Sequence, residues 1–310
     1  MKNIHRILTC VLFGILLMPS MTANAGNDDR RGTSGAAELL INPWVRSSGW
    51  GGVNTACGSG VDALFSNVAG LAHTTGTETT FGYTSWLQNS GVSNIAVGLA
   101  QSLGDYGVLG LSVNSMNFGT IDKTTVGSPE MGNNGTFKIS MMNIAVSYAK
   151  AFSNTIYAGA TIKIVNEGID NVTGTGVAID AGVKYVTGDN YELKFGIALK
   201  NWGPSMSFSG DGLSTNALFQ YSNHYQTLEQ RSASFELPSS LNIGMSYDFL
   251  FAENKHRVTV AGNFASMAFG RDLYTAGLEY GFMTYFMLRA SYTYEEALTE
   301  SLFDENGSTS

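Results

Sequence analysis

Residues 143–202 alternate between apolar and small or polar side chains through four consecutive segments, and this pattern constrains the fold more than any other feature. Ile162 and Ile164 lie on one face of such a segment, and Thr161 and Lys163 lie on the other. A period of two predicts β-strands with two chemically different faces. A soluble sandwich would show long polar side chains on its second face, but here that face carries mainly Gly, Ala, Ser and Asn. The pattern favours a transmembrane β-barrel with lipid outside and a crowded lumen.

Composition is compatible with one large exported domain. The chain has 310 residues, of which 44% are hydrophobic and 14% are charged, and no change of composition after the N-terminal region marks a linker. The formal net charge is -8, and no basic patch recommends a nucleic acid as partner.

Residues 1–25 have the features of a signal peptide. Lys2 and Arg6 provide a positive start, an apolar run covers residues 7–18, and residues 23–25 read Ala-Asn-Ala, a small-x-small cleavage pattern. The apolar run is too short for a spanning helix. We therefore expect export to the bacterial outer membrane, with lipid as a partner. Cys57 is then the single mature cysteine, which excludes an intramolecular disulfide and fits a small buried thiol.

Residues 26–76 lack the alternation and are rich in glycine turns. Asp62 is expected to begin a short helix whose apolar side is Ala63, Leu64, Val68 and Leu71. This region is either a packed lead-in or a plug inside the barrel.

The barrel domain is expected over residues 77–310. We predict eleven antiparallel up-and-down strands, at 77–87, 93–102, 107–118, 142–149, 155–165, 175–186, 192–201, 240–249, 257–264, 273–280 and 286–295. The parity change at Met141-Met142 predicts a bulge. Connections at 103–106, 150–154, 187–191, 250–256 and 281–285 are short and are expected at the periplasmic side, with the N-terminus; those at 119–135 and 202–239 are long and are expected outside. Tyr and Phe residues beside the short turns fit an interfacial girdle.

Charges within these strands fall on the face opposite to lipid, where a charge at mid-membrane would cost about 2–4 kcal/mol. They form a predicted lumen charge network of Lys163, Asp180, Lys184, Lys194, Lys200, Asp248, Arg257, Glu279 and Arg289. Opposite charges on adjacent strands, such as Lys163 with Asp180 and Glu279 with Arg289, are expected to pair. The network either neutralises a packed lumen or guides a substrate.

The long connection at 202–239 is the candidate partner-binding external loop, with aromatic residues Phe208, Phe219, Tyr221 and Tyr225. The alternative is a lid that folds back onto its own barrel.

No motif for catalysis, a cofactor or a metal is present: the histidines lack metal spacing and no G-x-S-x-G occurs. We therefore expect no enzyme, although a hydrolytic site assembled from distant Ser, His and acidic residues stays open.

The chain resembles the PorV/PorQ-like proteins, which are relatives of FadL-type outer-membrane barrels. The resemblance rests first on residues 49–53, Gly-Trp-Gly-Gly-Val, and residues 62–72, which begin at Asp62 and include Asn67 and Gly70. The family motif residues are Gly49, Gly51, Gly52, Asp62, Asn67 and Gly70. Further matches are VSYAK at 146–150, DAGV at 180–183, KNWG at 200–203, LP at 237–238 with LNIG at 241–244, and LEY at 278–280 with LRA at 288–290. Trp50, Ser66 and Val68 replace the Met, Trp and Pro usual in the family.

The resemblance implies a barrel of about fourteen strands in type IX protein secretion. There, PorV-like members bind the C-terminal domains of secreted cargo, and PorQ-like members help to hold surface-attachment machinery. A FadL-like passage for small hydrophobic molecules is the alternative. Eleven strands would leave an open edge in lipid, so we expect either that about three C-terminal strands are missing or that the N-terminal region contains further strands.

Overall fold

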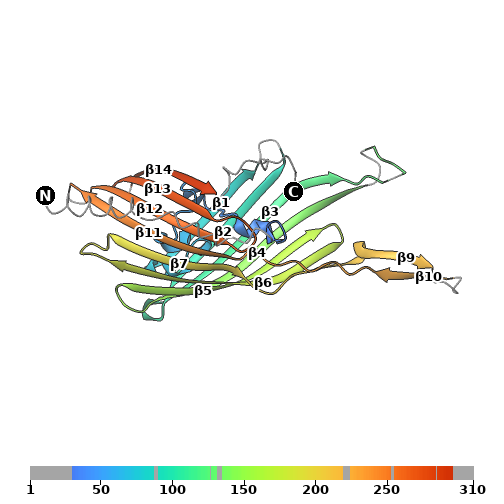
Figure 1. Cartoon of the computed structure of the whole chain (residues 1–310), viewed down its shortest axis with the longest axis horizontal. Coiled ribbons are helices and arrows are strands. Elements are labelled where there is room, and N and C mark those ends of the chain that lie inside the picture. Colours follow the sequence, from blue (N-terminus) through green and yellow to red (C-terminus); the bar gives the residue numbers. More distant parts are fainter. Residues whose placement is uncertain are drawn as a thin grey trace, which may run out of the picture.

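The computed structural model describes residues 30–86, 90–125, 127–130, 135–218, 224–252, 255–283 and 285–295. Within these ranges eleven long strands form one antiparallel sheet, each pairing with the next long strand along the chain (Figure 1). They are β1 (Thr77–Trp86), β2 (Val92–Ser102), β3 (Val108–Asp122), β4 (Thr136–Ala151), β5 (Ile156–Ile169), β6 (Val172–Thr187), β7 (Leu193–Trp202), β11 (Ser240–Phe251), β12 (His256–Met267), β13 (Leu273–Phe282) and β14 (Phe286–Glu295). The predicted all-β, up-and-down architecture is confirmed.

Three short strands belong to the connection between β7 and β11. β8 (Phe208–Ser209) pairs with β6, and β9 (Ser214–Leu218) pairs with β10 (Tyr225–Glu229) in a separate hairpin. A short 3-10 helix, η6 (Asp211–Leu213), lies between β8 and β9. The hairpin extends away from the sheet (Figure 1). The long loop expected at 202–239 is therefore partly strand.

The two faces of the sheet have the chemistry of a transmembrane sheet. Ile162, Ile164 and Ile197 are 59%, 51% and 51% exposed, whereas Lys163 between two of them is 5% exposed. Side chains on neighbouring residues of a strand point to opposite faces, so the apolar set faces outward and the charged set faces inward. An outward apolar band with polar groups inside is what a bilayer requires. In the described ranges, no helix has the length and apolar character needed to cross a membrane.

The sheet curves but does not close within the described residues, because β1 and β14 are its edges and no ladder joins them. Residues 30–76 add no strand to it; they contribute a single bridge between Ser34 and Glu236. The expectation of further strands in the N-terminal region is therefore wrong for residues 30–76, which form short helices instead.

The bulge predicted at Met141-Met142 is wrong. β4 keeps one register against β5 from Ile139 to Ala151, and the irregularity lies on β3 between Asn117 and Thr120. Toward the long-connection end, Thr136, Lys138 and Ser140 point outward, while Phe137, Ile139 and Met141 are partly buried. The parity is therefore unchanged. What changes is the surroundings, because polar side chains suit the outer face where a hairpin projects beyond the apolar band.

Residues 36–76, here called the inner segment, fill the concave side of the sheet (Figure 1). They form η2 (Ala37–Leu40), α2 (Val45–Ser48), η3 (Gly60–Phe65) and η4 (Val68–His73). The single helix expected from Asp62 is thus two 3-10 helices. They are separate because Asn67 adopts an extended conformation and its side chain caps η4 by accepting a hydrogen bond from Ala69 N. The predicted apolar side is buried as expected.

The inner segment crosses the interior from one end of the sheet to the other. Just before its start, Gly32 N donates to Phe269 O in the β12–β13 connection, and Arg30 pairs with Glu236. At its finish, Ser102 N donates to Gly76 O, beside η5 (Gly104–Tyr106) in the short β2–β3 turn. The first strand therefore starts at the short-turn end, as predicted, but residues 30–36 lie at the opposite end, contrary to the expected position of the N-terminal part.

Inward glycines leave room for this segment. A Cβ atom added to Gly196 would lie 2.3 Å from Thr55 O, and one added to Gly182 would lie 2.1 Å from Asn67 Oδ1. The same close approach occurs on strands all around the sheet, at Gly98, Gly110, Gly159, Gly182, Gly196, Gly244 and Gly277. Outward Gly262 has no such neighbour. The small residues of the inward face thus match a tightly fitted inner segment.

Candidate functional site

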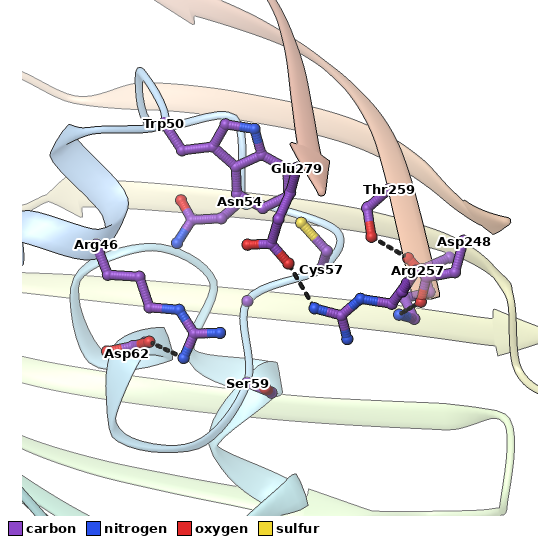
Figure 2. Close-up of a pocket in the computed structure, with 12 residues that line it drawn as sticks. Arg46, Trp50, Asn54, Cys57, Ser59, Asp62, Asp248, Arg257, Thr259 and Glu279 are labelled. Atoms are coloured by element: carbon purple, nitrogen blue, oxygen red, sulfur yellow. Dashed lines mark hydrogen bonds and ion pairs between the residues drawn. The ribbon is translucent and has the colours of Figure 1, made fainter. Parts of the chain in front are cut away.

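A polar hollow of ≈ 120 Å³ lies between the inner segment and the strands β7, β11, β12 and β13 (Figure 2). The inner segment contributes Arg46, Trp50, Asn54, Cys57, Gly58, Ser59 and Asp62, and the sheet contributes Lys194, Asp248, Arg257, Thr259 and Glu279. Five of these residues belong to the predicted lumen network or the N-terminal motif. Separate parts of the sequence thus meet at one charged site.

Ion pairs run along the wall of this hollow. Glu279 lies between two arginines, with Arg257 Nη2 2.5 Å and Arg289 Nε 2.6 Å from its carboxylate oxygens. On β7 and β11, Lys194 Nζ lies 2.6 Å from Asp248 Oδ2. Glu279 and Arg289 are directly opposite each other on β13 and β14, whereas Arg257 with Glu279 and Lys194 with Asp248 are diagonal neighbours that their long side chains bring into contact.

The inner segment forms its own ion pair across the hollow from these residues. Arg46 Nη1 lies 3.0 Å from Asp62 Oδ2, which joins α2 to η3 (Figure 2). Thr259 donates to Asp248 at 2.6 Å. The charges of the hollow are therefore largely neutralised within it, and its free surface is polar without a strong net charge.

A second group of predicted charges lies on β5, β6 and β7. Lys163 Nζ is 2.5 Å from Asp180 Oδ2 and donates to Asn201 Oδ1 at 2.8 Å. Lys184 and Lys200 have backbone partners in the inner segment: their ammonium groups donate to Gly58 O and Phe65 O, each at 2.9 Å. These two lysines tie the sheet to the inner segment.

Cys57 lines the polar hollow, but its thiol has low reactivity. Burial raises the pKa of its thiol to about 11, more than the nearby lysines lower it. A thiol with this pKa stays protonated at neutral pH and is a poor nucleophile.

A larger hollow of ≈ 240 Å³ lies between the inner segment and the inward face of β11–β14. Its wall combines apolar Leu40, Phe65 and Leu273 with Lys200 and the amide of Asn263. Asn263 Oδ1 is buried and has no hydrogen-bond partner in the described part of the chain. Thr293 on the edge strand β14 also lines this hollow. The site is amphipathic and suits a molecule with both an apolar body and a hydrogen-bonding group.

The N-terminal motif residues are structural parts of the inner segment. Gly51 and Gly52 have φ values of +60° and +72°, which favour glycine. Asn67 is 1% exposed and, besides capping η4, donates to Thr55 O and Val183 O. A Cβ on Gly70 would lie 2.3 Å from Gly58 O. Gly49 follows α2 directly, where its N–H donates to Val45 O.

Of the predicted external-loop residues, Phe208 and Tyr225 lie in different elements. Phe208 is on β8 and packs on Phe235, with ring centroids 5.3 Å apart, so this part of the connection folds back onto the sheet. Tyr225 is on β10 and is 73% exposed. Phe219 and Tyr221 lie outside the described residues.

Sequence reasoning missed two acidic residues that meet inside the sheet, Glu38 on η2 and Glu167 on β5. Glu167 has the inward parity of β5 and could have been added to the lumen network on that basis. Glu38 lies in a region without a periodic pattern, so the sequence did not indicate that its side chain faces the interior. In the described residues no group of three or more His, Cys, Asp or Glu side chains has the geometry to hold a metal ion.

Comparisons with known proteins give structural likeness alone. No protein-family model matches the chain, and no curated protein matches its sequence. The chain is similar to the toluene transporter TodX of Pseudomonas putida, with 13% identity, 81% of this chain and 83% of that chain covered, and a TM-score of 0.47. A mutant of the TodX monoaromatic hydrocarbon channel gives 13% identity, 83% coverage of each chain and a TM-score of 0.49. The β domain of the Bordetella autotransporter BrkA gives 12% identity, 71% and 87% coverage, and a TM-score of 0.35.

Proposed function

We propose that the chain is an outer-membrane protein that passes small amphipathic or hydrophobic molecules through its interior, with the inner segment acting as a plug. The observation that carries this proposal is the ≈ 240 Å³ hollow, which has apolar and hydrogen-bonding groups on one wall and lies inside a sheet whose outer face is apolar. Clefts of this mixed character suit small organic molecules.

Two further features favour transport of small molecules through the interior over their retention there. Single hydrogen bonds of Lys184, Lys200 and Asn67 join the inner segment to the sheet beside buried apolar contacts. Passage therefore requires a local shift of the segment that breaks some of these contacts without unfolding the sheet. The polar hollow continues the interior toward the short-turn end, near Lys194 and Asp248. Its ion pairs present polar surface with little net charge, which favours neutral molecules over ions.

Flux into vesicles with a lipopolysaccharide outer leaflet tests the proposal. The probe is 4-nitroanisole, a small aromatic molecule with an acceptor group, and arabinose is the fully polar comparison. Wild-type protein should speed the entry of 4-nitroanisole more than that of arabinose. Ala265→Phe fills the larger hollow and should slow this entry several-fold, whereas the matched Ala276→Phe on the outward face of β13 should not. Equal entry with and without protein contradicts the proposal.

A second candidate function has its own observation. The β9–β10 hairpin projects beyond the sheet and exposes Leu218 (55%) and Tyr225 (73%), which are suitable anchors for a protein partner (Figure 1). This fits the partner-binding role that the PorV/PorQ resemblance implies, in which cargo domains or translocon subunits of type IX secretion would dock here. A pull-down from solubilised outer membrane, with and without residues 214–229, tests it. Partners recovered equally by both proteins would exclude the hairpin as their docking site.

A further inference from the structure

Two buried carboxylates face each other at the long-connection end of the interior. Glu38 on η2 and Glu167 on β5 are 4% and 7% exposed, and their carboxyl groups lie within hydrogen-bond reach of each other. Neither carboxylate oxygen of Glu38 has a hydrogen-bond donor among the described residues. Two ionised carboxylates cannot share such a place without a positive charge between them.

Two asparagines that line a small cavity together with Glu38 add buried amide oxygens. Asn114 on β3 and Asn143 on β4 are direct cross-strand partners and are 2% and 6% exposed. The Oδ1 atom of each is buried and has no partner in the described ranges. Both residues line, with Glu38, a small cavity of ≈ 10 Å³, and Glu167 reaches this group through its contact with Glu38. A space of this size holds one water molecule or one ion.

The lysine that lines this cavity is already paired with other groups. Lys163 also lines the cavity, but its ammonium group is held by Asp180 at 2.5 Å and Asn201 at 2.8 Å. The protein thus holds two acids and two amide oxygens in a place that strongly favours an added positive charge.

We propose that Glu38, Glu167, Asn114 and Asn143 form a binding site for one calcium ion. Calcium takes oxygen ligands from carboxylates and amides at flexible geometry, and its charge balances the two carboxylates. Magnesium fits less well, because it retains several water molecules and the cavity has no room for them. The site would join η2 of the inner segment to β3, β4 and β5.

This inference is independent of what the interior passes, and it assigns a regulator of the inner segment. Bound calcium holds η2 against the wall of the sheet, so the segment is fixed at its beginning by the ion and farther along by Lys200 and Lys184. Ions at millimolar concentration would then set how easily the segment shifts.

Calorimetric titration of calcium chloride into chelator-treated full-length protein in detergent at pH 8 tests the proposal. We expect one ion per chain with a dissociation constant on the order of 0.1–1 mM, the range of extracellular calcium modules. Calcium should also raise the unfolding temperature more than magnesium does at equal concentration. Glu38→Gln and Glu167→Gln should each lower the affinity at least tenfold, and the exposed-loop variant Glu130→Gln should keep it.

Because glutamine preserves the shape of glutamate, the Glu38→Gln protein is expected to fold, and its own melting curve in chelator checks this directly. Loss of calcium binding in a folded Glu38→Gln protein supports the site. Two results overturn it: the absence of both binding heat and a calcium-dependent melting shift in the wild type at 10 mM calcium, or an unchanged affinity in the Glu38→Gln and Glu167→Gln variants.

Discussion

Lys163 on β5 and Asp180 on β6 form an ion pair of 2.5 Å in which both side chains are 7% exposed. A buried pair depends on both partners, because removing one charge leaves the other without compensation. We expect Asp180→Asn to lower the free energy of unfolding by about 3–5 kcal/mol. Urea unfolding in detergent micelles measures this. Asp189→Asn, in the exposed β6–β7 turn, is the matched control and should change the midpoint little; equal effects of the two substitutions would contradict the prediction.

The two arginines that flank Glu279 should respond unequally to substitution. Glu279→Gln leaves both Arg257 and Arg289 without their carboxylate, whereas Arg257→Gln removes a side chain that is 35% exposed and can be replaced by water. We expect the first substitution to cost about 2–4 kcal/mol and the second less than about 1 kcal/mol. The same urea titration measures both variants. A larger loss of unfolding free energy in Arg257→Gln than in Glu279→Gln would contradict the prediction.

Ile162 lies on the apolar outer face of the sheet, and its substitution tests whether this face contacts the bilayer core. Its side chain is 59% exposed in the middle of β5, so Ile162→Lys places a charge in hydrocarbon and should cost about 2–4 kcal/mol of stability in a bilayer. Ile156→Lys, on the same face of the strand beside the short β4–β5 turn, should cost about 0–1 kcal/mol. Reversible unfolding from lipid vesicles gives both values. If the two substitutions cost the same, the apolar face does not contact a bilayer core.

His73 makes stability depend on pH. Burial, with a contribution from Lys184, lowers the pKa of this ring from 6.5 to about 4, and the ring stacks on Tyr157 at 4.2 Å. Protonation therefore favours the unfolded chain, and the contribution of His73 to stability is complete above pH 6.5 and declines as the pH falls toward 4. The partly exposed ring should account for roughly 1–3 kcal/mol. His73→Gln should flatten the difference in unfolding free energy between pH 7.5 and pH 4.5; an unchanged pH dependence would assign it to other groups.

Gly196 and Gly262 offer a matched pair on opposite faces of the sheet. A Cβ on Gly196 meets Thr55 O at 2.3 Å, while one on Gly262 has nothing within 4 Å. Gly196→Val should therefore displace the inner segment and make residues 50–60 cleavable by added protease, and Gly262→Val should not. Mass spectrometry of the fragments reads the outcome, and equal protection of both variants would show that the segment is not held by this contact.

Periodicity predicted the sheet because its strands repeat every two residues in a two-faced environment. Ile162, Lys163 and Ile164 were assigned to the correct sides for that reason. The same logic failed at Met141-Met142, where the outer surroundings change from apolar to polar while the backbone continues regularly. For the inner segment, the sequence indicated the buried side of a helix beginning at Asp62 but not its division into two 3-10 helices, because elements this short show no repeat. Asn67 and Glu38 acquire their roles from strands more than a hundred residues away, and only the tertiary structure shows this.

The inner segment also sets an order of assembly. Gly51 lies beside Ser291 and Thr275, and Trp50 lies beside Gly277. Gly58 O accepts a hydrogen bond from Lys184. Residues near the start of the chain therefore contact strands that come much later in the sequence. Contacts this far apart in sequence make folding slow, since the intervening chain must lose its freedom before they form. Until β13 packs on them, Trp50 and Val53 stay uncovered, and partly assembled chains expose an apolar surface that favours aggregation.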